Sequence, residues 1–310
     1  MSGFYSLVHL RHTNNLLFWR LAAPIPYDRA LSTDDQIHKE KFMTSNTNTP
    51  LQARNLGAVN WLGLWTLYKK EVRRFMKVGP QTLLAPMVSN VLYMTVFILA
   101  FLEQRGGSDG SFTRFLIPGL IMMGILNNAS ANSSSSIMTG KVMGSIVDVL
   151  MPPLSSAELA IGYIAGAITR GIIVAFATAF ALYFFAVIIP VHIWAILYFG
   201  LSAAACMAMV GVLSGIWAEK FDQLAFVNQF IVMPLSMLSG TFYHITVLPD
   251  VLQKISLANP LFYFIDGFRY GFLGTADGSI LIGVIYTSIL NVVLFVTCLL
   301  VLKSGWRLKA

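Results

Sequence analysis

The chain has 310 residues, of which 56% are hydrophobic and only 11% are charged. A soluble domain carries about 25% charged residues, so the composition excludes an ordinary soluble protein and indicates a membrane protein. The net charge is +7 and the pI is about 9.4. Basic cytoplasmic loops explain this excess, which does not favour a nucleic-acid partner. Cys206 and Cys298 lie in apolar runs and are expected to be packing residues, not a disulfide or metal ligands.

Residues 1–60 are more polar than the rest, and we expect a disordered cytoplasmic tail there, followed by a membrane domain over 61–310. The segment 61–79 has aromatic and aliphatic residues at helical spacing and a basic cluster in its second half. This pattern predicts an amphipathic helix on the cytoplasmic membrane surface. It fits either a plain anchor or an anchor that also helps to hold a partner.

Long apolar runs predict an all-α integral membrane fold with six transmembrane helices. The expected spans are 83–102, 115–137, 159–188, 194–217, 224–238 and 280–302. Glycines in the third and fourth spans predict close helix packing. Basic residues gather before the first span and after the last, while the 190–192 turn has none and the 103–110 turn has few. Both termini are therefore predicted to be cytoplasmic.

Polar residues inside two spans are costly toward lipid, so they should face another helix or a water-accessible path. They are Asn127, Asn128 and Asn132 in the second span and Asn228 in the fifth. Bonding between helices and lining of a translocation path both remain open for them. Arg170 in the third span offers three alternatives: snorkelling, pairing with a carboxylate, or contact with an anionic substrate.

The segment 234–274 stays apolar but is broken repeatedly by glycine and proline. It is too interrupted to be one spanning helix and too apolar to be a soluble loop. We expect the exit half of a span followed by a helical hairpin that re-enters the outer leaflet. Asp266 and Arg269 in this hairpin are spaced i,i+3, which favours an ion pair between them, with substrate contact as the alternative.

The order of residues in this segment resembles the signature of ABC-2 type exporter permeases. The series is Ser239-Gly240-x-Phe242-Tyr243, Leu248-Pro249, Asn259-Pro260-Leu261 and Asp266-x-x-Arg269. Members of that family export drugs, polysaccharides, lipids or lipo-oligosaccharides with the help of a separate ATPase. The resemblance covers roughly residues 60–310. It implies a homodimer in the lipid of the bacterial inner membrane, bound to two copies of an ATP-binding subunit that holds the ATP and magnesium.

A double proline ends the segment 139–158, which predicts a short amphipathic helix on the cytoplasmic side. With the preceding 132–136, it is similar to the family's coupling segment, which sits in a cleft of the ATPase. An incidental loop helix is the alternative. The coupling residues that the resemblance implies are Lys141, Gly144, Asp148, Leu150, Pro152, Pro153 and Glu158.

Sequence motifs for chemistry are absent. The Gly140-Lys141 pair lacks the upstream glycine and the following Ser or Thr of a nucleotide-binding loop, and the histidines lack metal-ligand spacing. We therefore expect no catalytic residue, metal site or cofactor in this chain, and an ATP-driven export permease as its function. A secondary transporter or a polytopic membrane enzyme is the alternative, although no internal repeat supports the former. The sequence leaves the substrate open among drugs, lipids and glycans.

Overall fold

The computed structural model describes residues 57, 59–102 and 111–308, and the regular elements within these ranges are all helical. The expected tail falls outside the described residues apart from 57, 59 and 60, and the expected 103–110 turn lies outside them entirely. In chain order the elements are α2 (Trp61–Lys77), α3 (Gly79–Leu102), α4 (Ser111–Val142), α5 (Ile146–Leu150), α6 (Ser156–Tyr183), α7 (Ile193–Trp217), α8 (Phe221–Phe226), η1 (Val227–Val232), α9 (Met233–Leu238), η2 (Ile245–Val247), α10 (Asp250–Ala258), α11 (Pro260–Leu273) and α12 (Ile280–Ser304).

Five helical runs in the described part of the chain are long and apolar enough to cross a membrane. They are Gly79–Ala100, Ser156–Tyr183, Ile193–Trp217, Phe221–Leu238 and Ile280–Ser304. These runs coincide with five of the six expected spans. The remaining expected span, 115–137, lies inside α4, which has 32 residues but carries a serine- and asparagine-rich second half. The polar second half of α4 thus distinguishes this helix from the five apolar runs.

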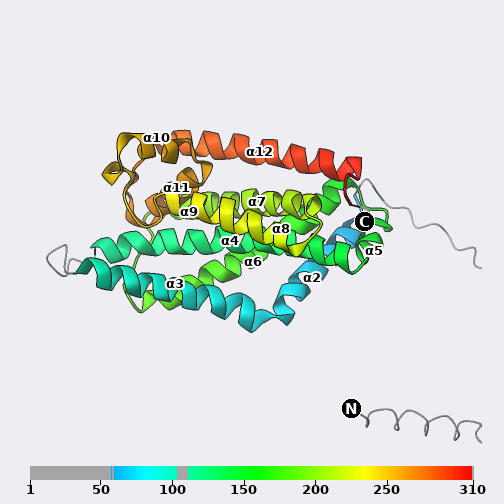
Figure 1. Ribbon diagram of the computed structural model, residues 1–310, viewed down its shortest axis with the longest axis horizontal. Coiled ribbons are helices and arrows are strands. Elements are labelled where there is room, and N and C mark those ends of the chain that lie inside the picture. The colour runs from blue at the N-terminus through cyan, green and yellow to red at the C-terminus, as the bar shows by residue number, and fades with distance from the viewer. Residues whose placement is uncertain (1–56, 58, 103–110, 309–310) are drawn as a thin grey trace, which may run out of the picture. The chain divides into compact units, whose positions relative to one another are not determined.

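The helix α4 lies at the centre of the bundle (Figure 1). Most of its side chains between Phe115 and Met138 are buried, and α6, α7 and α11 pack against it. A helix enclosed by protein does not need an apolar surface, so its polar residues are not exposed to lipid. This enclosure explains why a membrane-length helix tolerates so many serines and asparagines.

Glycines bring α7 into backbone contact with the polar half of α4. A Cβ added at Gly211 would lie 2.3 Å from the Ser130 carbonyl oxygen, and one at Gly215 would lie 3.0 Å from the Ser134 carbonyl oxygen. A side chain at either position would force the two helices apart. The small residues of α7 therefore set its close approach to α4, as the sequence predicts.

Two helical runs depart from the expected spans. The third span ends at Tyr183 rather than near residue 188, and the loop after it is held by Val191 and His192, whose amides donate to the Gly271 carbonyl at 2.9 and 2.8 Å. The fifth span is a continuous run of α8, η1 and α9, and η1 is a π-helical segment that the sequence did not predict. Cys206 and Cys298 are buried free thiols, as expected.

The broken segment after α9 forms short helices, which confirms the expected interruption. Gly240 takes a φ of 72°, a left-handed conformation that favours glycine, and turns the chain out of α9. The chain then passes through η2 into α10 and α11, which meet at Asn259. This segment caps one end of the bundle, away from α5 (Figure 1).

Candidate functional site

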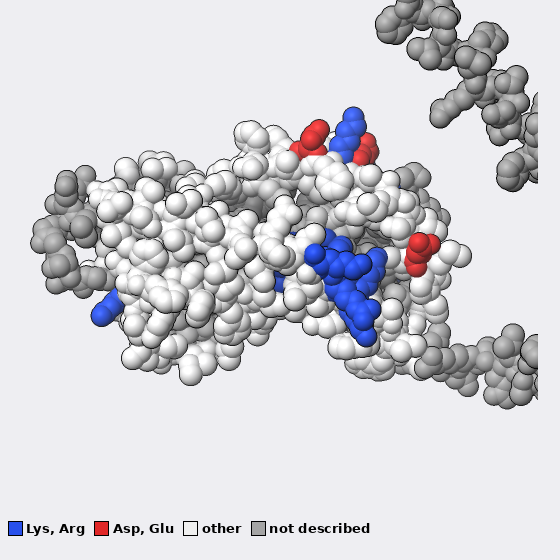
Figure 2. Space-filling view, turned by 90° about the horizontal axis from the view of Figure 1, so that it is seen from below, with Lys and Arg blue, Asp and Glu red and all other residues white. Residues whose placement is uncertain are grey.

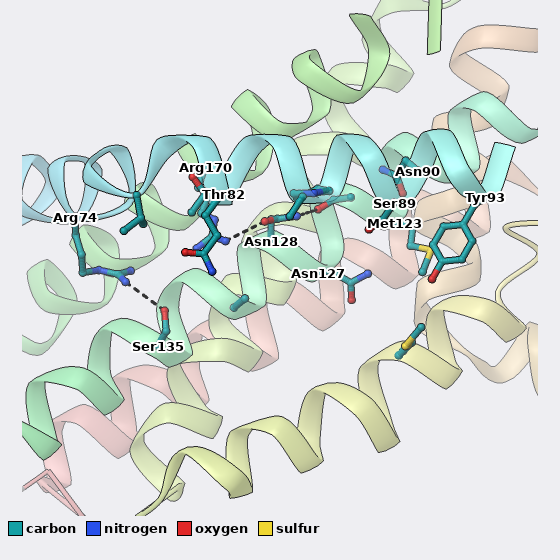
Figure 3. A pocket seen from close by; sticks show the side chains of 17 residues that line it. Arg74, Thr82, Ser89, Asn90, Tyr93, Met123, Asn127, Asn128, Ser135 and Arg170 are labelled. Atoms are coloured by element: carbon teal, nitrogen blue, oxygen red, sulfur yellow. Dashed lines mark hydrogen bonds between the residues drawn. The ribbon is translucent and has the colours of Figure 1, made fainter. Parts of the chain in front are cut away.

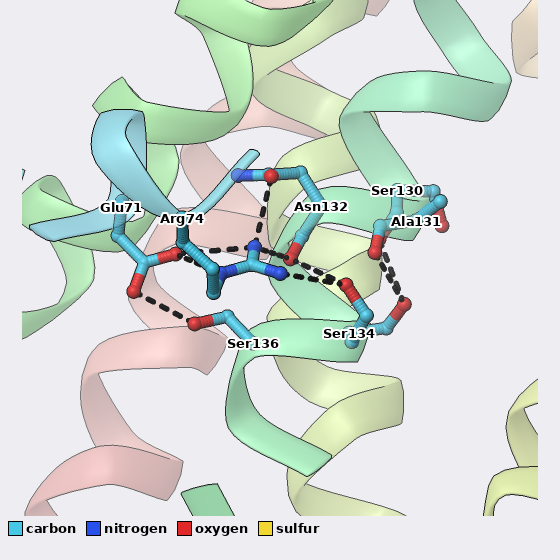
Figure 4. A network of polar contacts seen from close by, with 8 residues as sticks. Glu71, Arg74, Ser130, Ala131, Asn132, Ser134 and Ser136 are labelled. Atoms are coloured by element: carbon cyan, nitrogen blue, oxygen red, sulfur yellow. Dashed lines mark hydrogen bonds and ion pairs between the residues drawn. The ribbon is translucent and has the colours of Figure 1, made fainter. Parts of the chain in front are cut away.

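A buried polar network joins α2 to the polar half of α4 (Figure 4). The Glu71 carboxylate is fully buried, and it accepts a hydrogen bond from the Ser136 hydroxyl at 2.7 Å and lies 3.3 Å from the Arg74 guanidinium. Arg74 also donates to the main-chain and side-chain oxygens of Asn132 at 2.8 and 2.9 Å, and to the Ser135 hydroxyl at 3.2 Å. The charged pair is therefore neutralised and hydrogen-bonded, as burial of charges requires.

The spacing of residues in α2 places Glu71 in this network. Leu67, Glu71 and Phe75 recur every four residues, lie on one helix face and are all buried. Gly166 of α6 makes room for this face, since a Cβ there would lie 2.6 Å from the Glu71 Cβ. Sequence reasoning missed Glu71, although a carboxylate within an apolar stripe was the available signal. It also grouped Arg74 with the basic surface cluster, whereas the structure turns Arg74 inward.

The other basic residues of α2 remain on the surface. Lys69, Lys70, Arg73 and Lys77 are exposed, and Figure 2 shows basic side chains gathered over this helix on an otherwise largely uncharged face. A cluster of one sign raises the local concentration of anions. The surface beside the network is therefore electropositive.

A cavity of about 610 Å³ lies next to the network, between α3, α4, α6 and α9 (Figure 3). Arg74 and Arg170 lie toward one side of it, and Tyr93 and Met123 toward the other. Its polar lining residues are Arg74, Gln81, Thr82, Ser89, Asn90, Tyr93, Asn127, Asn128, Ser135 and Arg170. Of the four asparagines predicted for a path, the cavity includes only Asn127 and Asn128. Asn132 belongs to the buried network, and the side-chain oxygen of Asn228 lies 3.5 Å from the Ser130 hydroxyl.

Arg170 is the cation in this cavity that lacks a carboxylate. Its Nη2 donates to the Asn128 side-chain oxygen at 3.0 Å, while its Nε is buried without a hydrogen-bond partner among the described residues. The cavity-lining residues include no Asp or Glu. Of the three sequence alternatives for Arg170, pairing with a carboxylate therefore has no support among the described residues.

The segment after α4 differs from the expected amphipathic helix over 139–158. The helix α4 continues to Val142, Gly144 takes a left-handed φ of 68°, and α5 has only five residues. Lys141 lies within α4 and donates to the Ile216 and Ala218 carbonyls at 2.8 and 2.6 Å, at the C-terminal end of α7. Partial burial lowers the pKa of the Lys141 ammonium, and the nearby Glu219 carboxylate opposes that shift. Lys141 thus ties α4 to α7.

Glu158 fastens the other end of this loop. Its carboxylate accepts hydrogen bonds from the Ser155 main-chain amide and hydroxyl, and its own main-chain amide donates to the Ser155 hydroxyl oxygen, which completes a capping box at the start of α6. It also accepts from the main-chain amide of Asn60, the N-cap of α2. The loop, residues 143–153, is therefore anchored at Lys141 and at Glu158.

The middle of this loop presents apolar side chains to the outside. Met143, Val147 and Met151 are 75%, 51% and 77% exposed. Of the remaining residues predicted for coupling, Asp148, Pro152 and Pro153 are also exposed, and Leu150 is half-buried.

The motif residues after α9 bind the broken segment to itself. The Asn259 amide donates to the Leu235 carbonyl and to the Ser239 hydroxyl, both at 2.8 Å, and its side-chain oxygen caps α11 through the Leu261 amide at 3.0 Å. Pro260 occupies the first turn of α11, Phe242 stacks on Phe97 with ring centres 4.5 Å apart, and Pro249 precedes α10. The motif holds the turns between short helices, and none of its residues lines the cavity.

The predicted ion pair between Asp266 and Arg269 is wrong. Asp266 accepts from the main-chain amides of Asp277 and Gly278, each at 2.9 Å. Arg269 donates to the Gly240 carbonyl at 2.6 Å, and its guanidinium lies 3.8 Å from the centre of the Phe115 ring. The i,i+3 spacing put both residues on one face, but main-chain groups distant in sequence offer each of them a better partner.

Comparison with known proteins places these features within one matched region. Residues 63–273 match the ABC-2 type transporter family. The inner membrane transport permease YadH of Escherichia coli (strain K12) is 34% identical over 253 residues, which cover 81% of this chain and 98% of that protein. Nodulation protein J of Neorhizobium galegae is 23% identical over 228 residues, 70% of this chain and 83% of that protein. The capsule polysaccharide export inner-membrane protein CtrC of Neisseria meningitidis serogroup A is 25% identical over 246 residues, 77% of this chain and 85% of that protein.

Proposed function

Because the chain belongs to the ABC-2 type transporter family and is a multi-pass membrane transport permease, we propose that it forms the path of an ATP-driven exporter. A separate ATP-binding subunit supplies the energy, and two copies of this chain assemble around the substrate in the inner membrane. The substrate is an amphiphilic, glycan-like or lipid-like molecule or a drug. The permease does no covalent chemistry on it.

The loop 143–153 is the observation that carries this proposal. Its exposed methionines and valine form a small apolar surface, which suits contact with another protein. Because Lys141 and Glu158 fasten its two ends, a partner that moves the loop would also move α7, α6 and α2. The exposed loop thus fits the contact through which an ATP-binding subunit drives the helices.

The topology that fits this role has α4 as the sixth crossing helix and both termini in the cytoplasm. At 32 residues, α4 is about 48 Å long, which exceeds the roughly 30 Å hydrocarbon core of a bilayer. Figure 1 shows α5 and the C-terminal end of α12 at the same end of the bundle. Lys303 lies in the last turn of α12 and Arg307 follows that end, and basic residues of this kind favour the cytoplasmic side. In this topology the hairpin of α10 and α11 re-enters the outer leaflet.

A secondary transporter would need a titratable or cation-binding group near the middle of the membrane. Arg170 and Arg74 are half-buried cations that line the cavity, and no carboxylate among the described lining residues accompanies them to carry a proton or a metal cation. The lack of such a group among the described residues of the cavity lining therefore favours an ATP-driven exporter over a secondary transporter.

A surface substitution in the loop tests the proposal. Val147→Asp with Met151→Asp places two carboxylates on the exposed apolar surface, and Ser304→Asp at the same end of the bundle is the matched control. The double variant should keep the thermal midpoint of the wild type while co-purification with the ATP-binding subunit and ATP-dependent export fall at least about tenfold, equivalent to about 1.4 kcal/mol. Export by the purified chain in vesicles without any ATP-binding subunit would contradict the proposal.

A further inference from the structure

The two arginines of the cavity differ in how their charges are balanced. Arg74 has the Glu71 carboxylate 3.3 Å away. Arg170 has only the neutral Asn128 as a hydrogen-bond partner, and no carboxylate in the described part of the chain pairs with it. Removing a charge from water without a counter-charge costs roughly several kcal/mol of stability in a protein, and the cost is larger inside a membrane. The cavity wall therefore carries a positive charge that an anion would neutralise.

Polar groups around Arg170 are available to such an anion. The buried Arg170 Nε has no partner, and the side chains of Asn127 and Ser89 form no hydrogen bond with the described residues although both line the cavity. Donors of this kind, together with a guanidinium, match the oxygen atoms of a phosphate or carboxylate. Thr82 and Asn90 are already engaged with neighbouring carbonyls and shape the wall instead.

The cavity is longer than an inorganic anion requires. Its lining extends along α3 from Gln81 to Tyr93, a rise of about 18 Å at 1.5 Å per residue. Tyr93 and Met123 lie away from the arginines (Figure 3), and Met233 of α9 and Pro86 add apolar wall. A charged part and an apolar part within one cavity fit a molecule with the same division.

We propose that this cavity binds the anionic head group of an amphiphile, a phosphate or carboxylate, with Arg170 contacting the anion and the alkyl portion lying toward Tyr93 and Met123. The inference rests on the proposed export function and narrows its substrate class to anionic amphiphiles. The helix α2, which contributes Arg74 to the cavity lining, also carries exposed basic residues, and their charge attracts such molecules toward this part of the surface.

Direct binding to the purified full chain tests this inference without the ATP-binding subunit. The probes are dodecyl phosphate, dodecylphosphocholine and inorganic phosphate, titrated in a neutral maltoside detergent and followed by native mass spectrometry. The wild type should bind dodecyl phosphate at least about tenfold more tightly than dodecylphosphocholine. Arg170→Gln should abolish this preference, Arg170→Lys should keep part of it, and Arg114→Gln, an exposed arginine of α4, should leave it unchanged.

A second variant covers the case in which Arg170→Gln does not fold. Asn128→Asp keeps the shape of the side chain that contacts Arg170 but supplies a carboxylate, so it should also remove the preference for dodecyl phosphate. Equal binding of the two amphiphiles by the wild type, or an unchanged preference in both variants, would overturn the inference. Displacement of dodecyl phosphate by an equal concentration of inorganic phosphate would overturn the amphiphile assignment.

The outcomes also separate this inference from the proposed function. Loss of the binding preference together with intact ATP-driven export of another substrate would overturn the inference alone. A retained preference with transport that ignores the ATP-binding subunit would overturn the proposed function alone.

Discussion

Two arginines within helices of this chain, the buried Arg269 and the half-buried Arg170, occupy different environments. Arg269, only 2% exposed, is enclosed by protein: it donates to the Gly240 carbonyl and lies over the Phe115 ring. Arg170 opens onto a cavity and has a single neutral partner in Asn128. Arg269 also has two nitrogens, Nε and Nη1, that are buried without a hydrogen-bond partner among the described residues, but it does not line the cavity, whereas Arg170 does. Arg269 thus helps to hold the segment that follows α9, and Arg170 lies where a ligand can reach it. The surroundings of an arginine, not its presence in an apolar helix, distinguish a structural residue from a binding residue.

The largest loss of stability is expected on substitution of Asp266, which lies in α11, the helix that also carries Arg269. Asp266→Ala removes the charged acceptor of two main-chain amides, those of Asp277 and Gly278, and leaves both partly buried groups without this partner. We expect a loss of about 4 kcal/mol in the free energy of unfolding, at about 2 kcal/mol per amide. Thermal unfolding in detergent measures this loss. The stability of Asp266→Asn should be intermediate, and that of the control Asp250→Ala, at an exposed position, should be near wild type. A wild-type midpoint for Asp266→Ala would show that the segment does not depend on this carboxylate.

The two arginines themselves can be compared by the same substitution. Arg269→Gln loses a charged hydrogen bond and a cation–π contact, which together should cost about 3 kcal/mol of stability. Arg170→Gln loses one hydrogen bond but also removes an unbalanced charge, so its stability should stay within about 1 kcal/mol of wild type. Thermal midpoints of both variants without added ligand give the answer. Equal destabilisation would erase the distinction between the enclosed and the open site.

The smallest of the three effects concerns the contact between α7 and α4, the helix that contributes several residues to the cavity lining. Gly211→Ala would place a Cβ 2.3 Å from the Ser130 carbonyl oxygen, whereas Gly171→Ala would place one at an ordinary 3.5 Å from Ile125. We expect Gly211→Ala to lower stability by about 2 kcal/mol through overpacking and Gly171→Ala to be near neutral. The thermal midpoints of the two variants measure the difference. Similar midpoints for both would mean that α4 and α7 do not depend on this close contact.

Hydrophobic runs predicted most of the fold because chain length and apolar composition decide where helices of membrane length form. Five of the six expected spans correspond to apolar helical runs, and the family resemblance drawn from the segment 239–269 is confirmed. The polar half of α4 was recognised as facing protein or water. The sequence could not predict which of its polar residues join the buried network and which line the cavity, because Asn132 and Asn127 differ only in which neighbouring helix each one faces.

The contacts that failed prediction depend on residues far apart in sequence. Asp266 and Arg269 were paired by spacing, yet the turn at 277–278 and the carbonyl of Gly240 bind them instead. Arg74 was assigned to the membrane surface because local charge patterning carries no information about the inward-facing Glu71 partner. Local periodicity fixes the face of a helix on which a residue lies, but not the tertiary group that it meets.

Main-chain contact between α4 and α7 constrains how the molecule can move. A Cβ added at Gly211 would lie 2.3 Å from the Ser130 carbonyl oxygen, so α4 and α7 are already as close as their backbones allow. We therefore expect the two helices to move together. Widening of the cavity would then require movement of the helices on its other side, α3 and α9. The π-helical segment η1, which directly precedes α9, gives the backbone a place to bend.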